Sequence, residues 1–124
     1  MKTAISTNAA PGAIGPYSQG VVAGHAVYVS GQLPIDPVTG QMPKTAAEQA
    51  HQCLTNIRAI LEAANSSLAD VVRVGIFMTD LAEFTAVNEV YSSFFSTPYP
   101  ARATVQVAAL PRGAKVEIEA AAVK

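Results

Sequence analysis

One arginine stands at the start of an otherwise uncharged segment near the C-terminal end of the sequence. In PYPARATVQV, residues 98–107, Arg102 is the only charged residue, and the run that follows it favours a β-strand. A guanidinium is costly to bury without a partner, so Arg102 either reaches solvent or binds an anion. Its planar fork of N–H donors matches the two oxygens of a carboxylate. Arg102 is therefore a candidate for binding a small carboxylic acid.

Two glutamates follow in the last predicted strand, KVEIEAAAV, residues 115–123. Side chains alternate across a strand, so Glu117 and Glu119 share one face of it, as Arg102 and Thr104 share a face of theirs. Because a short connection favours antiparallel neighbours, we predict that these polar side chains lie together on one sheet face. A glutamate beside Arg102 could transfer a proton or orient a water molecule, and the alternative is a cross-strand salt bridge. Strand alternation leaves open which glutamate faces the pocket.

Two further segments carry groups that could contact a ligand. In GPYSQG the phenol of Tyr17 could hydrogen-bond a ligand, although such a tyrosine more often anchors packing. In VSGQ the Ser30 hydroxyl and the Gly31 backbone N–H lie at a predicted strand end, where a ligand can approach closely, and an ordinary strand end is the alternative. The chain has no G-x-S-x-G motif and no phosphate loop, which gives little support to a covalent hydrolase or a nucleotide-binding protein.

Hydrophobic periodicity predicts the elements that position these residues. A helix is expected from Thr45 to about Ala64, because apolar residues recur on one stripe and Thr45 with Glu48 forms a capping box. A second helix is expected at about 81–95, with Asp80 as its N-cap. The predicted strands form a hairpin over 20–31 and then occupy 71–79, 103–110 and 115–123.

The last three predicted strands each have an apolar face, which we expect to lie under the two helices. These faces consist of Val72, Val74, Ile76 and Met78, then Val105, Val107 and Ala109, then Val116, Ile118, Ala120 and Ala122. The opposite face combines polar groups with small apolar residues, and only 14% of all residues are charged. A sheet that carries helices on one side and such a face on the other suggests a homo-oligomer with a polar pocket between subunits.

Composition argues against several classes of protein. At 124 residues we expect one domain, residues 1–124, and a net charge of −1 without a basic cluster argues against nucleic acid as a partner. No apolar run is long enough for a membrane helix and no secretory signal is evident, so we expect a cytoplasmic protein without membrane partners. Cys53 cannot form an internal disulfide, and with His25 and His51 it is a poor basis for a metal site. Cys53 falls on the apolar stripe of the first helix and is expected in the core.

Four blocks of the sequence together resemble the Rid (reactive intermediate deaminase) family, also called YjgF. They are AIGPYSQG (13–20), VYVSGQLPIDPVTG (27–40), DLAEFTAVNEVYSSFF (80–95) and PARATVQVAALPRGAKVEIEA (100–120), in the family's order and spacing. The resemblance covers nearly the whole chain. It implies an α+β, chorismate-mutase-like domain of the bacillus type. In that fold a mixed β-sheet carries two helices on one face, and the subunits form a homotrimer with sites at their interfaces.

The resemblance also implies an activity and a set of site residues. Family members hydrolyse enamines and imines such as 2-aminoacrylate, 2-iminopropanoate and 2-iminobutanoate to 2-keto acids and ammonia. They need no cofactor or metal, and they protect pyridoxal-phosphate enzymes. By resemblance Arg102 binds the substrate carboxylate, and Glu117, the first glutamate of E-I-E, positions the water. The implied substrate-binding residues are Tyr17, Ser30, Gly31 and Asn88, and Thr104 is expected to help orient the substrate.

The sequence departs from the family pattern at two points. Thr104 stands where many bacterial members have a cysteine, so the implied mechanism uses no nucleophilic thiol, and the segment before Pro100 is shorter than in many relatives. Two other classes of function remain open: an oligomeric protein that binds small carboxylates without catalysis, and a chaperone-like interaction protein. An assay of imine deamination separates the first from an enzyme, and the second predicts no dependence on Arg102.

Overall fold

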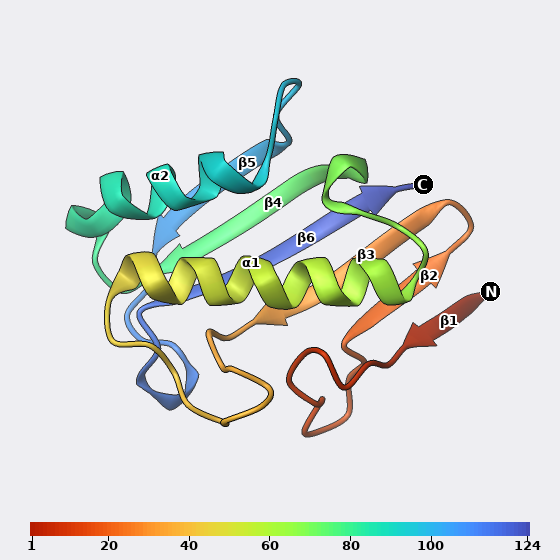
Figure 1. Ribbon diagram of the computed structural model, residues 1–124, viewed down its shortest axis with the longest axis horizontal. Helices are drawn as coiled ribbons and strands as arrows, with labels where there is room; N and C mark the ends of the chain where they lie inside the picture. The colour runs from red at the N-terminus through yellow and green to blue at the C-terminus, as the bar shows by residue number, and fades with distance from the viewer.

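The computed structural model describes residues 1–124 as one mixed sheet with two helices packed across one of its faces (Figure 1). The strands are β1 (Lys2–Ile5), β2 (Gly20–Ala23), β3 (Ala26–Gln32), β4 (Val71–Met78), β5 (Ala101–Gln106) and β6 (Val116–Val123), and the helices are α1 (Ala46–Ala63) and α2 (Phe84–Phe94). The sheet order is β1-β2-β3-β6-β4-β5, and every neighbouring pair is antiparallel except β4 and β5. The predicted α+β class with helices on one face is confirmed.

The helix α1 begins and ends as its sequence predicts. The Thr45 hydroxyl accepts a hydrogen bond from the Glu48 backbone N–H at 3.1 Å and donates to the Glu48 carboxylate at 2.8 Å, so the predicted cap is present. The apolar stripe, which includes Cys53, is buried against the sheet. At the other end the Lys124 ammonium donates to the Ala64 carbonyl at 2.8 Å, which places a positive charge at the negative end of the helix dipole.

The strand β4 follows its predicted alternation except near its start. Its inward positions from Val74 onward are buried, but Val72 is 48% exposed. The pairing of β4 with β6 shifts register between Val71 and Arg73, and this bulge turns Val72 outward and buries Val71 instead. The prediction that Val72 lies on the core face is therefore wrong.

The strand β5 lies elsewhere in the sheet than predicted. It pairs in parallel with β4 alone, whereas β6 is inserted between β3 and β4. The helix α2 connects β4 to β5, and parallel neighbours require a crossover of this kind. The short connection from β5 to β6 does not make those strands neighbours, so that part of the prediction is wrong. The strand β5 also ends at Gln106, short of the predicted boundary.

This placement inverts the predicted faces of β5. Arg102 lies opposite Val74 on the face covered by the helices, whereas Glu117 lies opposite Phe77 on the helix-free face. Val105, which the sequence pattern places under the helices, lies on the helix-free face and is 44% exposed. The expectation that Arg102 shares a face with the glutamates is therefore wrong within one chain.

The helix-free face of the sheet is apolar for an exposed surface. Tyr28, Val105 and Val123 are all exposed there. Apolar side chains exposed on a sheet face that no helix covers are typical of a surface that meets another protein chain. Neither helix is long and apolar enough to span a membrane.

Candidate active site

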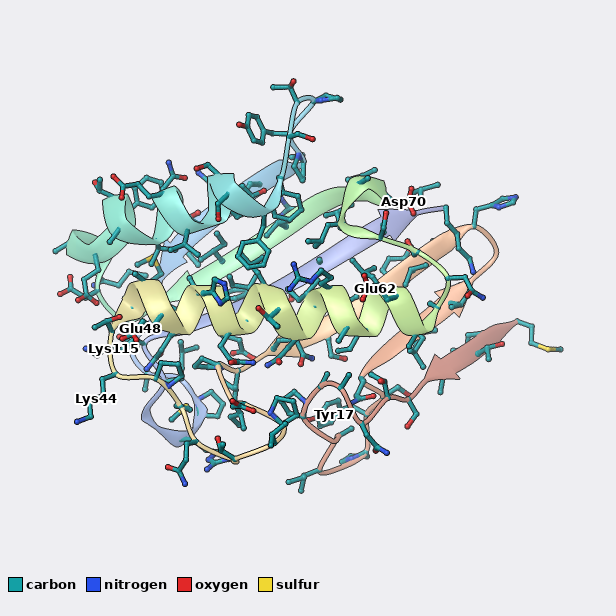
Figure 2. All side chains as sticks on the ribbon, viewed as in Figure 1. Tyr17, Lys44, Glu48, Glu62, Asp70 and Lys115 are labelled. Atoms are coloured by element: carbon teal, nitrogen blue, oxygen red, sulfur yellow. The ribbon has the colours of Figure 1, made fainter.

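The predicted site residues form two separate clusters. One hollow of about 560 Å³, here called the glutamate pocket, is lined by Tyr17, Ser30, Gly31 and Glu117. A second region between α2 and β5, here called the arginine pocket, consists of two adjoining hollows that share Arg102 and are lined by Asn88, Tyr91 and Thr104. The strands β6 and β4 separate β3 from β5, and Figure 2 shows the labelled Tyr17 on the side of α1 away from α2. The residues of each pocket lie close together, but the two pockets lie apart within one chain.

In the glutamate pocket the Glu117 side chain lies directly over a glycine. A Cβ atom at Gly31 would lie 2.5 Å from Oε2 of Glu117 and 3.1 Å from its Cδ, so no larger residue fits there with Glu117 in place. The β3–β6 ladder runs from Val29 opposite Ala120 to Gln32 opposite Ile118 and skips the two residues between. This bulge and the missing side chain together create the space that the carboxylate occupies.

The loop that carries Tyr17 is tied to β3 through backbone groups. The Ser30 hydroxyl donates to the Ser18 carbonyl at 2.6 Å, and the Ser30 N–H donates to the Gln19 carbonyl at 3.0 Å. The buried Gln19 side chain accepts from the Thr7 N–H and donates to carbonyls of the same N-terminal segment. Ser30 therefore uses its hydroxyl proton to hold this loop. Gln19 was not among the predicted site residues, although an amide within a Gly- and Pro-rich segment is a signal that backbone groups need a partner.

The surroundings of Glu117 weaken its acidity. Desolvation raises the pKa of Glu117 above its usual value, and the charge of Glu119 raises it further. Arg112 is the other charged residue that lines the pocket. Glu119 itself lies over Gly75 and lines a neighbouring hollow with Arg73, so Glu117 is the glutamate that shares a pocket with Tyr17. A carboxylate with raised proton affinity is suited to accept a proton from water.

In the arginine pocket Arg102 is held by side chains of α2. Its Nη1 donates to Oδ1 of Asn88 at 2.7 Å. Its guanidinium carbon lies 4.6 Å from the ring centroid of Tyr91 and 5.5 Å from that of Phe84. Arg102 is thus neither free in solvent nor paired with an acid, and the other N–H groups of its fork are available to an anion. Tyr91 was not among the predicted site residues, and its contact with Arg102 depends on the crossover that brings α2 to β5.

Two buried hydroxyls of the arginine pocket have no hydrogen-bond partner. They are the hydroxyl groups of Thr104 and Tyr91. Thr104 lies on β5 two residues after Arg102, on the same face. A buried polar atom without a partner costs about 1–3 kcal/mol, so two of them beside one arginine mark a region that is not optimised for stability alone.

Other groups that could do chemistry lie outside both pockets or do not cluster. No group of three or more His, Cys, Asp or Glu side chains is placed to hold a metal ion. Cys53 is fully buried in α1, where burial, and after it the charge of Glu117, raises the pKa of its thiol. The prediction that Cys53 is a core residue is confirmed.

The fold and the two pockets define a small α+β protein with an arginine in one pocket and a glutamate in the other. The chain belongs to the family whose model is described as Endoribonuclease L-PSP, which matches residues 7–124. A relative in Escherichia coli, TdcF, carries the name reactive intermediate deaminase, so this is the Rid family that the four sequence blocks resemble, and that resemblance is confirmed.

Relatives are similar over nearly the whole chain. The RutC family protein y4sK of Sinorhizobium fredii is 58% identical over 94% of this chain and 93% of its own length. A 2-iminobutanoate/2-iminopropanoate deaminase of Bos taurus is 51% identical over 97% of this chain and 88% of its own length. The crystal structure of Escherichia coli TdcF with bound serine has a TM-score of 0.95 to this chain at 48% identity, covering 98% of both.

Proposed function

We propose that the protein hydrolyses 2-imino and 2-enamine carboxylic acids to 2-keto acids and ammonia. The substrates are 2-aminoacrylate, its tautomer 2-iminopropanoate, and 2-iminobutanoate. The deaminase from Bos taurus supports this reaction, and the serine bound to TdcF supports a small amino-acid-like ligand. The observation that carries the proposal is the pair of prepared groups: Arg102 held at one edge of its fork by Asn88, and Glu117 held over Gly31 with a raised pKa.

The active site is assembled from two copies of the chain. Arg102 and Glu117 of one chain lie on opposite faces of the sheet, with β4 between their strands. Arg102 and Glu117 are thus two strand spacings apart, roughly 10 Å, in addition to lying on opposite faces. In the substrate the carboxylate and the imine carbon are joined by one bond, so one small molecule cannot contact both residues of the same chain. The glutamate pocket of one copy therefore faces the arginine pocket of the next. Repeating this head-to-tail contact closes a homotrimer with one site at each interface.

The mechanism uses groups of the polypeptide and water alone. Arg102 binds the substrate carboxylate, with Thr104 and the Gly31 N–H orienting the rest of the molecule together with Tyr17. The Glu117 carboxylate takes a proton from a water molecule as its oxygen attacks C2 of the imine. Glu117 returns that proton to the nitrogen, which gives the neutral amino alcohol. Glu117 then carries the hydroxyl proton of the amino alcohol to the same nitrogen, the C2–N bond breaks, ammonia leaves, and the C2–O bond becomes the keto group. Because the imine is already electrophilic, positioning and one proton-transfer group suffice.

Such a reaction suits a protein that works beside pyridoxal-phosphate enzymes in the cytoplasm. Dehydratases of that class release enamines and imines, which can damage other such enzymes. Hydrolysis removes the reactive species and so protects those enzymes.

A coupled assay tests the proposal. A pyridoxal-phosphate-dependent dehydratase generates 2-aminoacrylate from serine or 2-iminobutanoate from threonine, and keto-acid release is followed with and without the protein. We expect the wild type to accelerate release, and Arg102→Ala and Glu117→Gln to abolish the acceleration while both remain oligomeric. Full activity of Arg102→Ala would contradict the site assignment.

Mixing the two inactive variants tests the shared site. Each variant lacks a different half, so co-refolded oligomers contain some interfaces with an intact Arg102 from one copy and an intact Glu117 from another. Random assembly of equal amounts restores about one quarter of wild-type activity in a closed ring. A site within one chain would give no recovery.

The description of the family model names a second activity, cleavage of RNA. The chain has eight Lys and Arg residues against nine Asp and Glu, so its charge gives little attraction for a polyanion. Incubation of the wild type and Arg102→Ala with single-stranded RNA is the discriminating measurement. RNA cleavage without keto-acid release would replace the deaminase proposal.

A further inference from the structure

The helix α2 presents one row of side chains to Arg102. Phe84, Asn88 and Tyr91 are four and three residues apart in the sequence, so they lie on one face of the helix. Asn88 accepts a hydrogen bond from one edge of the Arg102 guanidinium, and the two aromatic rings lie within 5.5 Å of its carbon atom. The row thus contacts the guanidinium both through a hydrogen bond and through aromatic rings.

Of the two rings, that of Tyr91 lies closer to Arg102 and is itself packed against another ring. Its centroid lies 4.6 Å from the guanidinium carbon, and only 4% of the residue is exposed. The ring packs in turn on Phe95, with the two centroids 4.7 Å apart. A ring packed in this way has little freedom to follow a moving side chain, so it acts as a fixed support.

The hydroxyl of Tyr91, unlike its ring, makes no contact that holds Arg102. The buried oxygen has no hydrogen-bond partner. Desolvation raises the pKa of Tyr91, with the charge of Arg102 acting in the opposite direction, so the hydroxyl stays protonated near neutral pH. The contact with Arg102 is therefore between a cation and a neutral aromatic ring, and a phenylalanine would preserve it.

We propose that Tyr91 is a positioning residue whose ring fixes the plane of the Arg102 guanidinium, so that the N–H donors not bonded to Asn88 face the substrate carboxylate. The substrate in this statement rests on the proposed function. Arg102 is a long side chain on the edge strand β5 and would otherwise sample many rotamers. Bidentate binding of a carboxylate requires the guanidinium and the carboxylate to share a plane. Without the ring Arg102 keeps its charge and loses its orientation.

Three variants of α2 separate the ring from the hydroxyl and from general packing. Tyr91→Phe keeps the ring, and we expect its KM for 2-iminobutanoate to stay within twofold of wild type. Tyr91→Leu removes the ring, and we expect KM to rise roughly five- to thirtyfold while kcat changes much less. Phe94→Leu is the matched control: Phe94 lies on the same helix and carries a similar contact to Arg58, 5.5 Å from its ring centroid. We expect Phe94→Leu to lower the melting temperature and leave KM unchanged.

A double-mutant cycle shows whether Tyr91 acts through Arg102. Arg102→Lys keeps the charge without the planar fork, so adding Tyr91→Leu to it should change KM less than twofold. A full additional rise in KM when Tyr91→Leu is added to Arg102→Lys would overturn the proposal, as would an unchanged KM for Tyr91→Leu alone. If Tyr91→Leu does not fold, Tyr91→Met, which fills a similar volume, takes its place.

Binding of 2-oxobutanoate, measured by calorimetry, keeps this inference separate from the proposed function. The keto acid carries the same carboxylate but requires no catalysis. An inactive wild type that binds 2-oxobutanoate more tightly than Tyr91→Leu would refute the deaminase and support the positioning role. If the wild type deaminates imines but binds 2-oxobutanoate no better than Tyr91→Leu, the positioning role alone is refuted. If the wild type is inactive and does not bind 2-oxobutanoate, both the deaminase function and the positioning role are refuted.

Discussion

The two pockets hold their key side chains by different means. In the glutamate pocket Glu117 lies over Gly31 at a bulge of β3. Buried side-chain amides hold the surrounding loops: Gln19 hydrogen-bonds carbonyls of the N-terminal segment, and Asn56 donates to two carbonyls of the segment after β3. In the arginine pocket Arg102 is held by one hydrogen bond and two aromatic rings from α2. The first pocket is shaped by backbone and the second by side chains.

This difference decides how each pocket can fail. A pocket shaped by backbone has no spare volume at its closest contact, so an added atom does the most damage. A pocket built from side chains can absorb small additions at its open edge, so the removal of a ring or an amide does the most damage. Additions and removals made in each pocket therefore test whether the comparison is correct.

The largest effect is expected from one added methyl group in the glutamate pocket. In Gly31→Ala the new Cβ would lie 2.5 Å from Oε2 of Glu117, so the carboxylate must swing away. Because Glu117 is a flexible side chain, we expect the fold to persist and keto-acid release to fall roughly a hundredfold, the usual cost of misplacing a catalytic group by about 1 Å. Steady-state kinetics and a thermal melt check the two parts.

Gly12→Ala is the matched control for that change. Gly12 lines the same pocket, but a Cβ there would meet no atom within 4 Å. We expect activity within twofold of wild type. Equal losses from both variants would show that the pocket responds to any added volume and that the placement of Glu117 over Gly31 is not the cause.

The second effect concerns the stability of the same pocket. In Gln19→Ala the Thr7 N–H and three carbonyls lose their side-chain partner, so we expect the free energy of unfolding to fall by about 2–4 kcal/mol. Urea denaturation at one fixed protein concentration measures it, because the proposed oligomer couples stability to concentration. Gln41→Ala, at an exposed position, is the control. A loss below 0.5 kcal/mol, roughly the smallest effect expected of a single hydrogen bond, would show that buried amides do not support this pocket.

The elements of this fold could largely be predicted from the sequence. The capping pair Thr45 and Glu48, the apolar stripe of α1 and the hairpin of β2 and β3 are local signals, and the structure has them. The residue types of the two pockets also follow from short motifs. What these signals share is that each depends on neighbours within about a dozen positions.

The face and neighbours of β5 could not be predicted, because they depend on the crossover through α2. Alternation shows that Arg102 and Val105 point to opposite sides of their strand, but it does not say which side the helices cover. Both faces of this sheet are apolar in part, so Val105 matches the core pattern although it lies on the helix-free face. The bulge at Val72 inverts alternation in the same way, and no local residue type announces it.

The third effect is the removal of an amide from the arginine pocket. In Asn88→Ala the Arg102 guanidinium loses its one hydrogen bond within the chain but keeps its rings, so we expect KM to rise roughly three- to tenfold. Stability should change little, because the freed N–H can reach water. Glu89→Ala, the next and exposed residue of α2, should leave KM unchanged. If Asn88→Ala raises KM more than Tyr91→Leu does, the hydrogen bond rather than the ring is the main anchor of Arg102.

The smallest effect is a shift of the pH profile by Glu119→Gln. The pKa of Glu117 is raised by burial and then by the charge of Glu119. The proposed reaction needs Glu117 as the carboxylate. Activity should therefore fall as the pH drops through this raised pKa. Removing the charge of Glu119 lowers the pKa of Glu117, so the acid limb of the kcat profile should move to lower pH while the plateau is unchanged.

The raised pKa of Glu117 also affects stability, because the charged form of Glu117 destabilises the folded protein above that pKa. Glu117→Gln should therefore be more stable than wild type at pH 8. This advantage should disappear at low pH, where Glu117 is protonated. An acid limb that does not move in Glu119→Gln would mean that Glu117 titrates independently of its neighbour and that burial alone prepares the carboxylate.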